Sequence, residues 1–274
     1  MIQAARPIVL VGCGKMGGAL LSGWRARGMA AEAAVAVEIN PDLAEGVRRG
    51  QGIRVEAAPE ALPADLAPAV ILFAVKPQMM DGVAPAYRRF LRPDTLALSI
   101  AAGKTIATFH RYLGPEAAIV RCMPNTPAAV GRGITAAVAN PKVTAAQRAL
   151  ADELLRAVGE VVWLTDETLI DPVTAVSGGA PAYVALLVEV LAKAGAKAGL
   201  PAEVAMQLAR AGVAGSGELL FRSSEAASRL RENVTSPGGT TLEALKILMA
   251  ENGLQPLFDA AVTAATRRGR ELAG

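Results

Sequence analysis

The feature that most constrains the fold is a regular alternation of short apolar runs with helix-like segments through the first 165 residues. Several runs are rich in valine and isoleucine and lack a strict polar alternation, which is typical of strands buried on both faces. These predicted strands are Ile8–Val11, Ala34–Val37, Val70–Val75, Leu96–Ile100, Ile119–Met123, Ile134–Val138 and Val161–Leu164. The predicted helices between them are Gly17–Arg27, Pro41–Arg49, Met79–Leu91, Thr105–Leu113 and Thr144–Val158. The alternation predicts an α/β fold with a doubly wound, mostly parallel sheet.

After about Thr165 the strand pattern stops, and alanine-rich segments with helical spacing follow. The predicted helices are Ala180–Ala198, Pro201–Leu220, Ala226–Arg231, Thr241–Glu251 and Leu254–Leu272. The first is apolar on nearly every face until Glu189, and such a helix must be buried all round. We therefore expect two domains, residues 1–165 and 166–274, of which the second is all-α and pairs with a second chain. The alternative is burial within one compact domain.

Composition limits the classes of function. Apolar residues make up 52% and charged residues 19% of the chain, which excludes a disordered protein. The net charge is only +3, and the arginine pairs are scattered without aromatic residues between them, so no nucleic-acid partner is expected. One histidine and two cysteines argue against a metal site and favour a reducing, cytoplasmic compartment. The uncharged stretch Val173–Val188 falls short of the roughly 20 apolar residues that a bilayer requires, so no membrane partner is expected.

A glycine pattern follows the first predicted strand and opens the first predicted helix. In such a loop Gly12 permits a tight turn, Gly14 lets the backbone approach a pyrophosphate, and Gly17 lets the helix pack closely on the strand. Glu38 ends the second strand, where a carboxylate accepts hydrogen bonds from the adenosine ribose. The pattern predicts dinucleotide binding by the loop residues Gly12, Cys13, Gly14, Lys15, Met16 and Gly17.

The same glutamate bears on the choice between NADH and NADPH. A carboxylate at the ribose repels a 2′-phosphate and so favours NADH. Asn40, Arg48 and Arg49 lie nearby in the sequence and can offset that repulsion. Both cofactors therefore remain candidates.

Further loops follow predicted strands and should gather at the same edge of the sheet, because ligands of parallel sheets bind beyond the carboxyl ends of the strands. Lys76 suits a ribose or a phosphate, and Asn125 suits a nicotinamide amide or a substrate carboxylate. We expect Cys13 and Cys122 to be small packing residues and His110 to be structural. The remaining candidates for contact with the cofactor are Ala74, Val75, Pro77 and Ala101.

A second dense signal is the segment Val234–Glu243 in the helical half. Thr240 followed by Glu243 predicts a capping box at the start of a helix. Free N–H groups there, with the hydroxyls of Ser236, Thr240 and Thr241, would form a cradle for a carboxylate. Because the segment offers no strong general base, it favours hydride addition to a C=N bond, which can carry its own proton or take one from a hydroxyl or water.

With these segments in place, the chain resembles the pyrroline-5-carboxylate reductase family along nearly its whole length. The motifs that carry the resemblance are Val-Gly-Cys-Gly-Lys-Met-Gly, Ala-Val-Lys-Pro-Gln, Ser-Ile-Ala-Ala-Gly, Arg-Cys-Met-Pro-Asn-Thr-Pro, Pro-Ala-Tyr and Thr-Ser-Pro-Gly-Gly-Thr-Thr. The resemblance implies an N-terminal Rossmann-like domain and an all-α C-terminal dimerisation domain. It also implies reduction of 1-pyrroline-5-carboxylate to L-proline with NADPH or NADH.

The resemblance further implies roles for single residues. Thr241 would hydrogen-bond the imine nitrogen, and Val234 would line the substrate pocket. The substrate carboxylate would be held by Ser236, Gly239 and Thr240, and the cofactor by Gly12–Gly17, Lys76 and Asn125. Glu38 is not universal in the family, where a residue that tolerates a phosphate often stands. The chain departs from the family pattern at Gly179-Ala180, where a hydroxyl is lost, and at Ala226-Ala227-Ser228, where a His-Pro-Gly turn is common.

Two other functions are compatible with the glycine loop. A 3-hydroxyacid-type dehydrogenase would carry a lysine shortly after a Ser-Gly pair on the long helix, but the first lysine after Ser177 is Lys193. It would also need a proton donor for C=O reduction, which we do not find. A non-catalytic protein that senses dinucleotides would leave the turn around Thr241 without a role.

Overall fold

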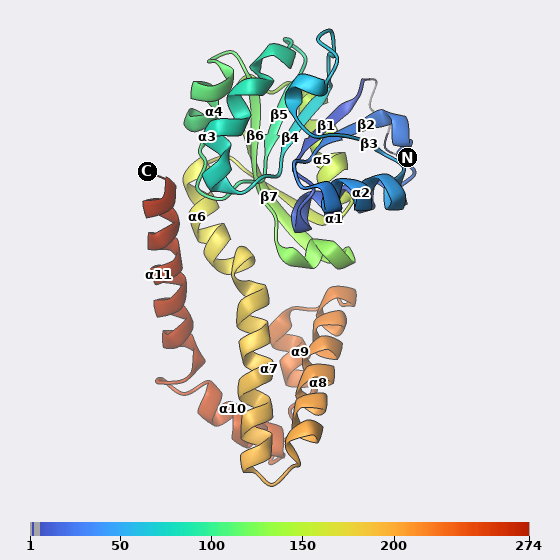
Figure 1. Cartoon of the computed structure of the whole chain (residues 1–274). Helices are drawn as coiled ribbons and strands as arrows, with labels where there is room; N and C mark the ends of the chain where they lie inside the picture. Colours follow the sequence, from blue (N-terminus) through green and yellow to red (C-terminus); the bar gives the residue numbers. More distant parts are fainter. Residues whose placement is uncertain (1, 3–5, 274) are drawn as a thin grey trace. The chain divides into compact units, whose positions relative to one another are not determined.

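The computed structural model describes residues 2 and 6–273, which form two compact units (Figure 1). One unit contains the described residues up to Gly178 together with the segment from Ala265 onward, and the other contains Gly179–Ala264. The expected domain boundary at 165/166 marks the end of the strand pattern and lies 13 residues before this division. The assignment of residues 166–274 as a functional domain stays a prediction.

The sheet of the first unit has eight strands in the order β3-β2-β1-β4-β5-β6-β7-β8. Strands β1 to β6 pair in parallel, β7 runs antiparallel to β6, and β8 is parallel to β7. The doubly wound, mostly parallel fold is therefore confirmed. The bounds are Ile8–Val11 (β1), Ala34–Val37 (β2), Arg54–Glu56 (β3), Val70–Phe73 (β4), Leu96–Ser99 (β5), Ala118–Met123 (β6), Gly133–Ala139 (β7) and Gly159–Leu164 (β8).

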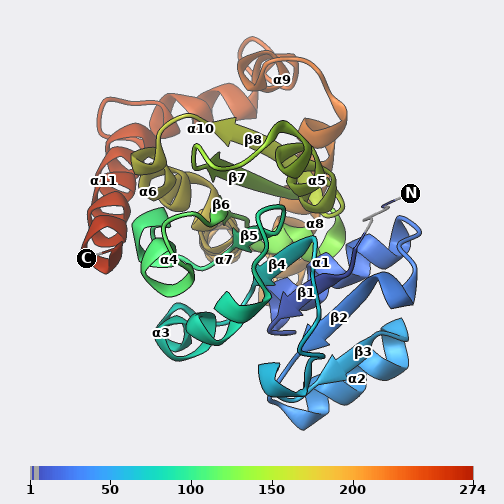
Figure 2. The same cartoon turned by 90° about the horizontal axis from the view of Figure 1, so that it is seen from above.

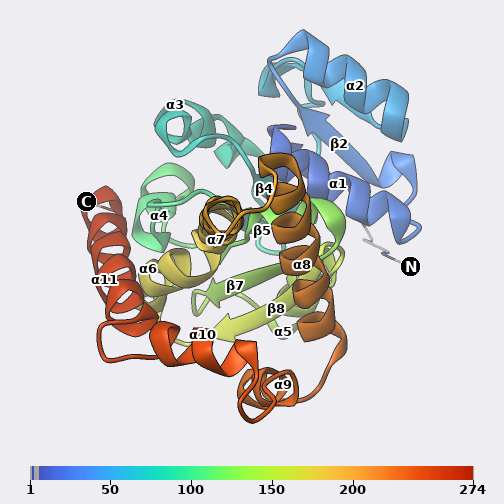
Figure 3. The same ribbon diagram turned by 90° about the horizontal axis from the view of Figure 1, so that it is seen from below.

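Helices cover both faces of this sheet, as Figures 2 and 3 show. The alternation of side chains along β1 separates two buried clusters. Ile8 and Leu10 belong to the cluster under α1 (Lys15–Ala26), α2 (Pro41–Gln51) and α5 (Ala145–Arg156). Val9 and Val11 belong to the cluster under α3 (Met80–Val83) and α4 (Ile106–Leu113). Burial on both faces explains why these strands lack a polar alternation.

Two local predictions in this unit differ from the structure. The edge strand β3 was not expected, because its three residues Arg-Val-Glu carry a charge at each end and bury only Val55. The predicted helix Met79–Leu91 is the short α3 followed by a 3₁₀ helix over Ala84–Phe90. Pro85 has no backbone N–H to donate, so a regular α-helix does not continue through it.

The segment after β8 is helical without a long break. Helix α6 (Ile170–Val173) passes through a π-helical turn over Thr174–Gly178 into α7 (Ala180–Lys197). The whole stretch Glu167–Lys197 is long and apolar enough to cross a membrane, by length and composition alone. The uncharged stretch Val173–Val188 lies inside this longer helix, and Pro181 does not interrupt it because it stands in the first turn of α7.

The second unit is a set of helices: α7, α8 (Ala202–Arg222), α9 (Ala227–Asn233), α10 (Thr240–Leu248) and the first half of α11 (Leu254–Ala273). Figure 1 shows α7 and α8 side by side as an antiparallel pair. Their shared seam is built from small side chains. Ala192, Ala205 and Ala209 are the buried residues described in this unit, and a Cβ on Gly195 would lie 3.3 Å from that of Ala205.

The large apolar side chains of these helices point away from the seam and are exposed. They include Val184, Leu186, Leu187, Val190, Leu191, Leu208, Leu219, Leu220, Leu257 and Phe258. The helices of this unit therefore do not bury α7 among themselves, which argues against burial within one compact domain. An apolar surface of this extent marks a contact with another molecule.

Candidate functional site

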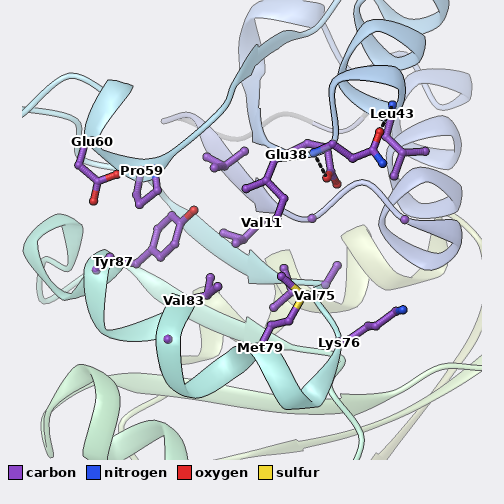
Figure 4. Close-up of a pocket in the computed structure, with 18 residues that line it drawn as sticks. Val11, Glu38, Leu43, Pro59, Glu60, Val75, Lys76, Met79, Val83 and Tyr87 are labelled. Atoms are coloured by element: carbon purple, nitrogen blue, oxygen red, sulfur yellow. Dashed lines mark hydrogen bonds between the residues drawn. The ribbon is translucent and has the colours of Figure 1, made fainter.

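A cavity of about 560 Å³ lies at the carboxyl ends of β1, β2 and β4 (Figure 4). This is the point where the strand order reverses, since β2 and β4 flank β1 on opposite sides. Ligands of doubly wound sheets bind at such a switch point. The cavity is lined by Val11, Gly12, Gly14, Val37, Glu38, Ile39, Asn40, Leu43, Pro59, Glu60, Ala74, Val75, Lys76, Met79, Gly82, Val83, Ala86 and Tyr87.

Gly12 and Gly17 are required by the backbone for the separate reasons that the sequence predicts. Gly12 has a φ of +94°, and a Cβ there would lie 3.0 Å from the carbonyl oxygen of Ala74. A Cβ on Gly17 would lie 2.1 Å from the carbonyl oxygen of Gly12, so only glycine lets the helix approach. A Cβ on Gly14 would meet no atom within 4 Å. Gly14 is therefore not required by packing, which leaves room on the loop for a ligand.

The N-terminus of α1 fits an anion such as a pyrophosphate. The helix begins at Lys15, no side chain caps it, and its first turn contains no acidic residue. The first N–H groups of a helix lack intrahelical partners, and the helix dipole is positive at this end. Together with the open space at Gly14, these features fit the pyrophosphate of a dinucleotide.

Glu38 joins the glycine loop to the loop after β2. Its Oε2 accepts a hydrogen bond from the N–H of Cys13 at 2.6 Å, and its Oε1 accepts one from the N–H of Asn40 at 2.8 Å. The side chain of Asn40 in turn caps α2 by accepting hydrogen bonds from the N–H groups of Asp42 and Leu43. The carboxylate is thus fixed at the edge of the cavity with oxygen lone pairs left for a ribose hydroxyl.

Some of the other predicted cofactor residues line the cavity, and others do not. Lys76 is exposed and lines the cavity with Ala74 and Val75, at the start of a short 3₁₀ helix that begins at Pro77. Ala101 is buried in the packing under α4 and is not among the lining residues.

Asn125 is also outside the cavity lining, and its side chain is bonded within the protein. Its Oδ1 accepts a hydrogen bond from the N–H of Ile134 at 2.9 Å, and its Nδ2 donates to the Oγ of Ser177 at 3.2 Å. This arrangement ties the loop after β6 to β7 and to the π-helical turn. Asn125 therefore positions the loop after β6.

The cysteines and the histidine have the expected packing character. Both thiols are free and buried, and burial raises the pKa of Cys13 to about 12, with the charge of Glu38 as a second cause. Burial also raises the pKa of Cys122. Neither is a nucleophile at neutral pH. His110 lies beside Asn140, which follows β7 and whose side chain bonds the backbone of Ala117 and Ile119 at the beginning of β6.

The turn in the helical unit is shaped differently from the prediction. Helix α10 begins at Thr240, and its N-cap is Gly239 without a side-chain hydrogen bond. The predicted capping box is wrong, because Glu243 pairs with Lys246 at 2.7 Å instead of reaching back. Gly238 has a φ of +70°, and the N–H of Gly239 bonds the carbonyl oxygen of Ser236 at 3.0 Å. An uncapped helix start beside exposed hydroxyls is the form that the carboxylate cradle requires.

Val234 and Thr241 are both exposed in this unit, Val234 at 67%. The departure at Gly179 also has a local reason. A Cβ on Gly179 would lie 2.3 Å from the hydroxyl oxygen of Tyr183, so a serine at this position would displace the tyrosine.

Several residues of the site were not expected from the sequence. Ile39, Leu43 and Met79 are exposed apolar residues around the cavity, and Tyr87 closes its wall in Figure 4. The apolar Ile39 directly after Glu38 was the available signal, since an exposed isoleucine beside a strand end suggests a surface for a flat ring. Tyr87 could not be assigned, because its position depends on the fold of a distant segment.

A buried ion pair also escaped the sequence analysis. Arg121 in β6 is 3% exposed, and its Nη1 lies 2.8 Å from Oε1 of Glu167, which also accepts the N–H of Ile106. The pair holds the end of β6 to the beginning of the helical stretch and to α4. In the sequence, Glu167 is 46 residues from Arg121 and 61 residues from Ile106, so no local pattern reveals these contacts.

Comparison with known proteins gives matches over both halves of the chain. The model of the family "Pyrroline-5-carboxylate reductase dimerisation" matches residues 167–272, and "NADP oxidoreductase coenzyme F420-dependent" matches residues 7–103. The pyrroline-5-carboxylate reductase of Pseudomonas aeruginosa is 40% identical over 97% of this chain and 96% of its own length. That of Escherichia coli is 36% identical over 97% of this chain and 98% of its own length.

Solved structures give the same result. A pyrroline-5-carboxylate reductase from Coxiella burnetii has a TM-score of 0.92 and 33% identity, covering 99% of this chain and 100% of its own. A pyrroline carboxylate reductase from Plasmodium falciparum with NADP bound has a TM-score of 0.80 and 28% identity, covering 98% and 99%.

Proposed function

Because the chain belongs to the pyrroline-5-carboxylate reductase family, we propose that it reduces the C=N bond of 1-pyrroline-5-carboxylate to give L-proline. The observation that carries the proposal is the full-length likeness to reductases of this name, at 40% identity over 97% of the chain. The cavity at the switch point supports it, because it has the form of a dinucleotide site. The reduced nicotinamide of NADH or NADPH supplies the hydride.

On the cofactor side, the residues of the first unit bind and orient. The N–H groups at the start of α1 hold the pyrophosphate, while Gly14 leaves space for its approach. Glu38 and Asn40 receive the adenosine ribose, and Lys76 provides a positive charge on the other side of β1. Asn125 acts by positioning its loop. The full set proposed for this side is Gly12, Cys13, Gly14, Lys15, Met16, Gly17, Glu38, Asn40, Ala74, Val75, Lys76, Pro77, Ala101 and Asn125.

On the substrate side, the turn before α10 holds the imino acid. The N–H of Thr240 at the uncapped start of α10 binds the carboxylate together with the Ser236 hydroxyl, while Gly239, whose own N–H bonds the carbonyl oxygen of Ser236, leaves space for its approach. The Thr241 hydroxyl hydrogen-bonds the imine nitrogen and stabilises the proton there as the neighbouring carbon is reduced. Val234 supplies an apolar wall. No general base is needed, since the nitrogen itself ends the reaction as the basic group.

The same proposal covers assembly and location. The apolar faces of α7, α8 and α11 pack against a second copy of the chain, so that residues 166–274 act as a helical substrate and dimerisation domain. This use of the Glu167–Lys197 helix, in place of a membrane, agrees with its match to a dimerisation family. Two free, buried cysteines fit a reducing cytoplasm.

One assay tests this function against its alternatives. Purified protein is mixed with NADH or NADPH and with 1-pyrroline-5-carboxylate or a 3-oxoacid, and nicotinamide absorbance is followed. We expect loss of absorbance with the imine alone, and mixtures without the imine serve as the control. Loss only with the 3-oxoacid would favour the hydroxyacid dehydrogenase. Tight cofactor binding without any turnover would favour the sensing protein. The relatives found favour neither alternative.

A further inference from the structure

We propose that this chain discriminates against NADPH, and that Glu38 is the residue that sets its preference for NADH. The inference depends on the proposed function only for the reaction, because the discrimination is a property of cofactor binding. Three observations support it: the position of the Glu38 carboxylate after β2, the two backbone N–H groups that bind it, and the contacts that Arg48 and Arg49 make with other groups.

The carboxylate of Glu38 is fixed by backbone groups from two different loops. The N–H of Cys13 bonds Oε2 at 2.6 Å, and the N–H of Asn40 bonds Oε1 at 2.8 Å. The residue is 9% exposed. Hydrogen bonds from N–H groups to an anionic oxygen are short and strong. Glu38 therefore cannot turn away from a ligand without breaking two bonds and disturbing the glycine loop.

The position of this carboxylate corresponds to the ribose of the adenosine. It follows β2, on the side of β1 opposite to β4, and an acid there accepts hydrogen bonds from the ribose hydroxyls. In NADPH the 2′-hydroxyl carries a phosphate with about two negative charges. That phosphate brings no hydroxyl to donate and places like charges together in a partly buried site, where solvent screens them weakly.

The cations that could neutralise the phosphate are engaged elsewhere. The Arg48 guanidinium donates to the carbonyl oxygen of Val55 at 2.8 Å and lies 3.7 Å from Glu45. Arg49 pairs with the same Glu45 at 2.6 Å. The sequence leaves open whether these two arginines offset the repulsion between Glu38 and a 2′-phosphate. In the structure their guanidinium groups contact other partners instead.

Within the part of the chain that the structure describes, Lys76 is the single cation among the cavity-lining residues. It follows β4, whereas Glu38 follows β2, and β1 lies between them. Two inter-strand spacings separate these positions by about 10 Å. Glu60, the other acid in the lining, lies on a different wall of the cavity from Glu38 in Figure 4.

This preference differs from what the comparisons alone suggest. One matching family is described as an NADP oxidoreductase, and the Plasmodium falciparum structure has NADP bound. The geometry around Glu38 therefore gives a result that family membership does not supply.

The test is a pair of equilibrium titrations, with NADH and with NADPH, followed by nicotinamide fluorescence. We expect the wild-type protein to bind NADH at least about tenfold more tightly, because a juxtaposed like charge costs more than that factor. Glu38→Gln and Glu38→Ser should each reduce this ratio by about tenfold. Glu60→Gln is the matched control, which removes a charge from the other wall and should leave the ratio within about twofold.

Three results would overturn the inference. These are equal or tighter binding of NADPH by the wild-type protein, an unchanged ratio in a folded Glu38 variant, or an equal change in Glu60→Gln. Circular dichroism and thermal unfolding identify folded variants, and the wild-type ratio needs no variant at all. The titrations contain no imine, so they give the same answer whether or not the protein reduces 1-pyrroline-5-carboxylate.

Discussion

The described residues up to Gly178 build two apolar clusters on either side of a sheet, whereas residues Gly179–Ala264 bury three alanines and expose most of their larger apolar side chains. In the first region Trp24, Phe73 and Tyr87 are fully buried. In the second, Leu187 is 49% exposed and Leu257 is 66% exposed. The contrast is not one of composition, because both regions are rich in apolar residues.

The difference concerns where the burial comes from. Burying a leucine or valine contributes about 1.5–3 kcal/mol relative to leaving it exposed. The sheet region obtains this from its own chain. The helical region has placed its large side chains outward and its small ones at the α7–α8 seam, so it obtains the same contribution only from another molecule. Its stability must therefore depend on protein concentration.

The largest effect is expected where the helical region meets its partner. Leu187 and Leu257 line one exposed apolar groove, formed by α7 and α11. Leu187→Asp places a charge in this groove in both copies of a symmetric dimer, and each unpaired charge costs several kcal/mol. We expect dissociation to monomers and activity near background, measured by analytical ultracentrifugation and the imine assay.

Its control is Ala149→Asp, at an exposed position on α5 of the sheet region. That change costs only the helix propensity difference of about 0.5–0.7 kcal/mol and should leave a dimer. If Leu187→Asp remained dimeric and active, the outward side chains would not be the interface, and the comparison would fail.

A second large effect is expected in the sheet region at Gly17, where the backbone of α1 packs against the backbone of the loop after β1. In Gly17→Ala the new Cβ lies 2.1 Å from the carbonyl oxygen of Gly12. We expect this overpacking to lower the free energy of unfolding by about 1–3 kcal/mol and to weaken dinucleotide binding at least about a hundredfold. Urea unfolding and NADH titration measure the two effects.

Gly14→Ala sharpens the same point. Its Cβ meets no protein atom within 4 Å, so we expect unfolding stability within about 0.5 kcal/mol of wild type and loss of binding nonetheless. Tight NADH binding by Gly14→Ala would contradict the role of this glycine in approaching the pyrophosphate.

A moderate effect is expected at the turn of the helical region. Thr241→Ala removes one hydroxyl that acts on the reacting nitrogen, and we expect kcat to fall by about ten- to a hundredfold. Thr241→Ser keeps the hydroxyl and should retain most of the rate. An unchanged kcat in the alanine variant would show that the turn only begins α10.

The smallest effect on activity is expected at Asn125, whose hydrogen bonds lie within the sheet region. Asn125→Ala leaves the N–H of Ile134 without its acceptor, which should lower the free energy of unfolding by about 1–3 kcal/mol. We expect KM for the cofactor to change less than about threefold in the folded variant. Asn125→Asp keeps the acceptor and should lose less stability. A large rise in KM with little loss of stability would instead make Asn125 a direct ligand of the cofactor.

The sequence by itself determined the features that depend on a few neighbouring residues. Strands β1 and β2 begin and end where the apolar runs do, and α10 and α11 begin within one residue of their predicted starts. The backbone requirements of Gly12 and Gly17 were predicted as well, because a turn with φ of +94° and a close helix approach are requirements that single residues reveal. Periodicity and conformational freedom are local properties of the chain.

Only the tertiary structure decided which distant groups meet. It joins Glu38 to Cys13, engages Asn125 with Ser177, and adds β3 at the edge of the sheet. It also decides that the apolar helices face outward. The physical reason is that a polar or apolar side chain is satisfied by any suitable partner, and chain folding selects that partner from segments tens of residues away.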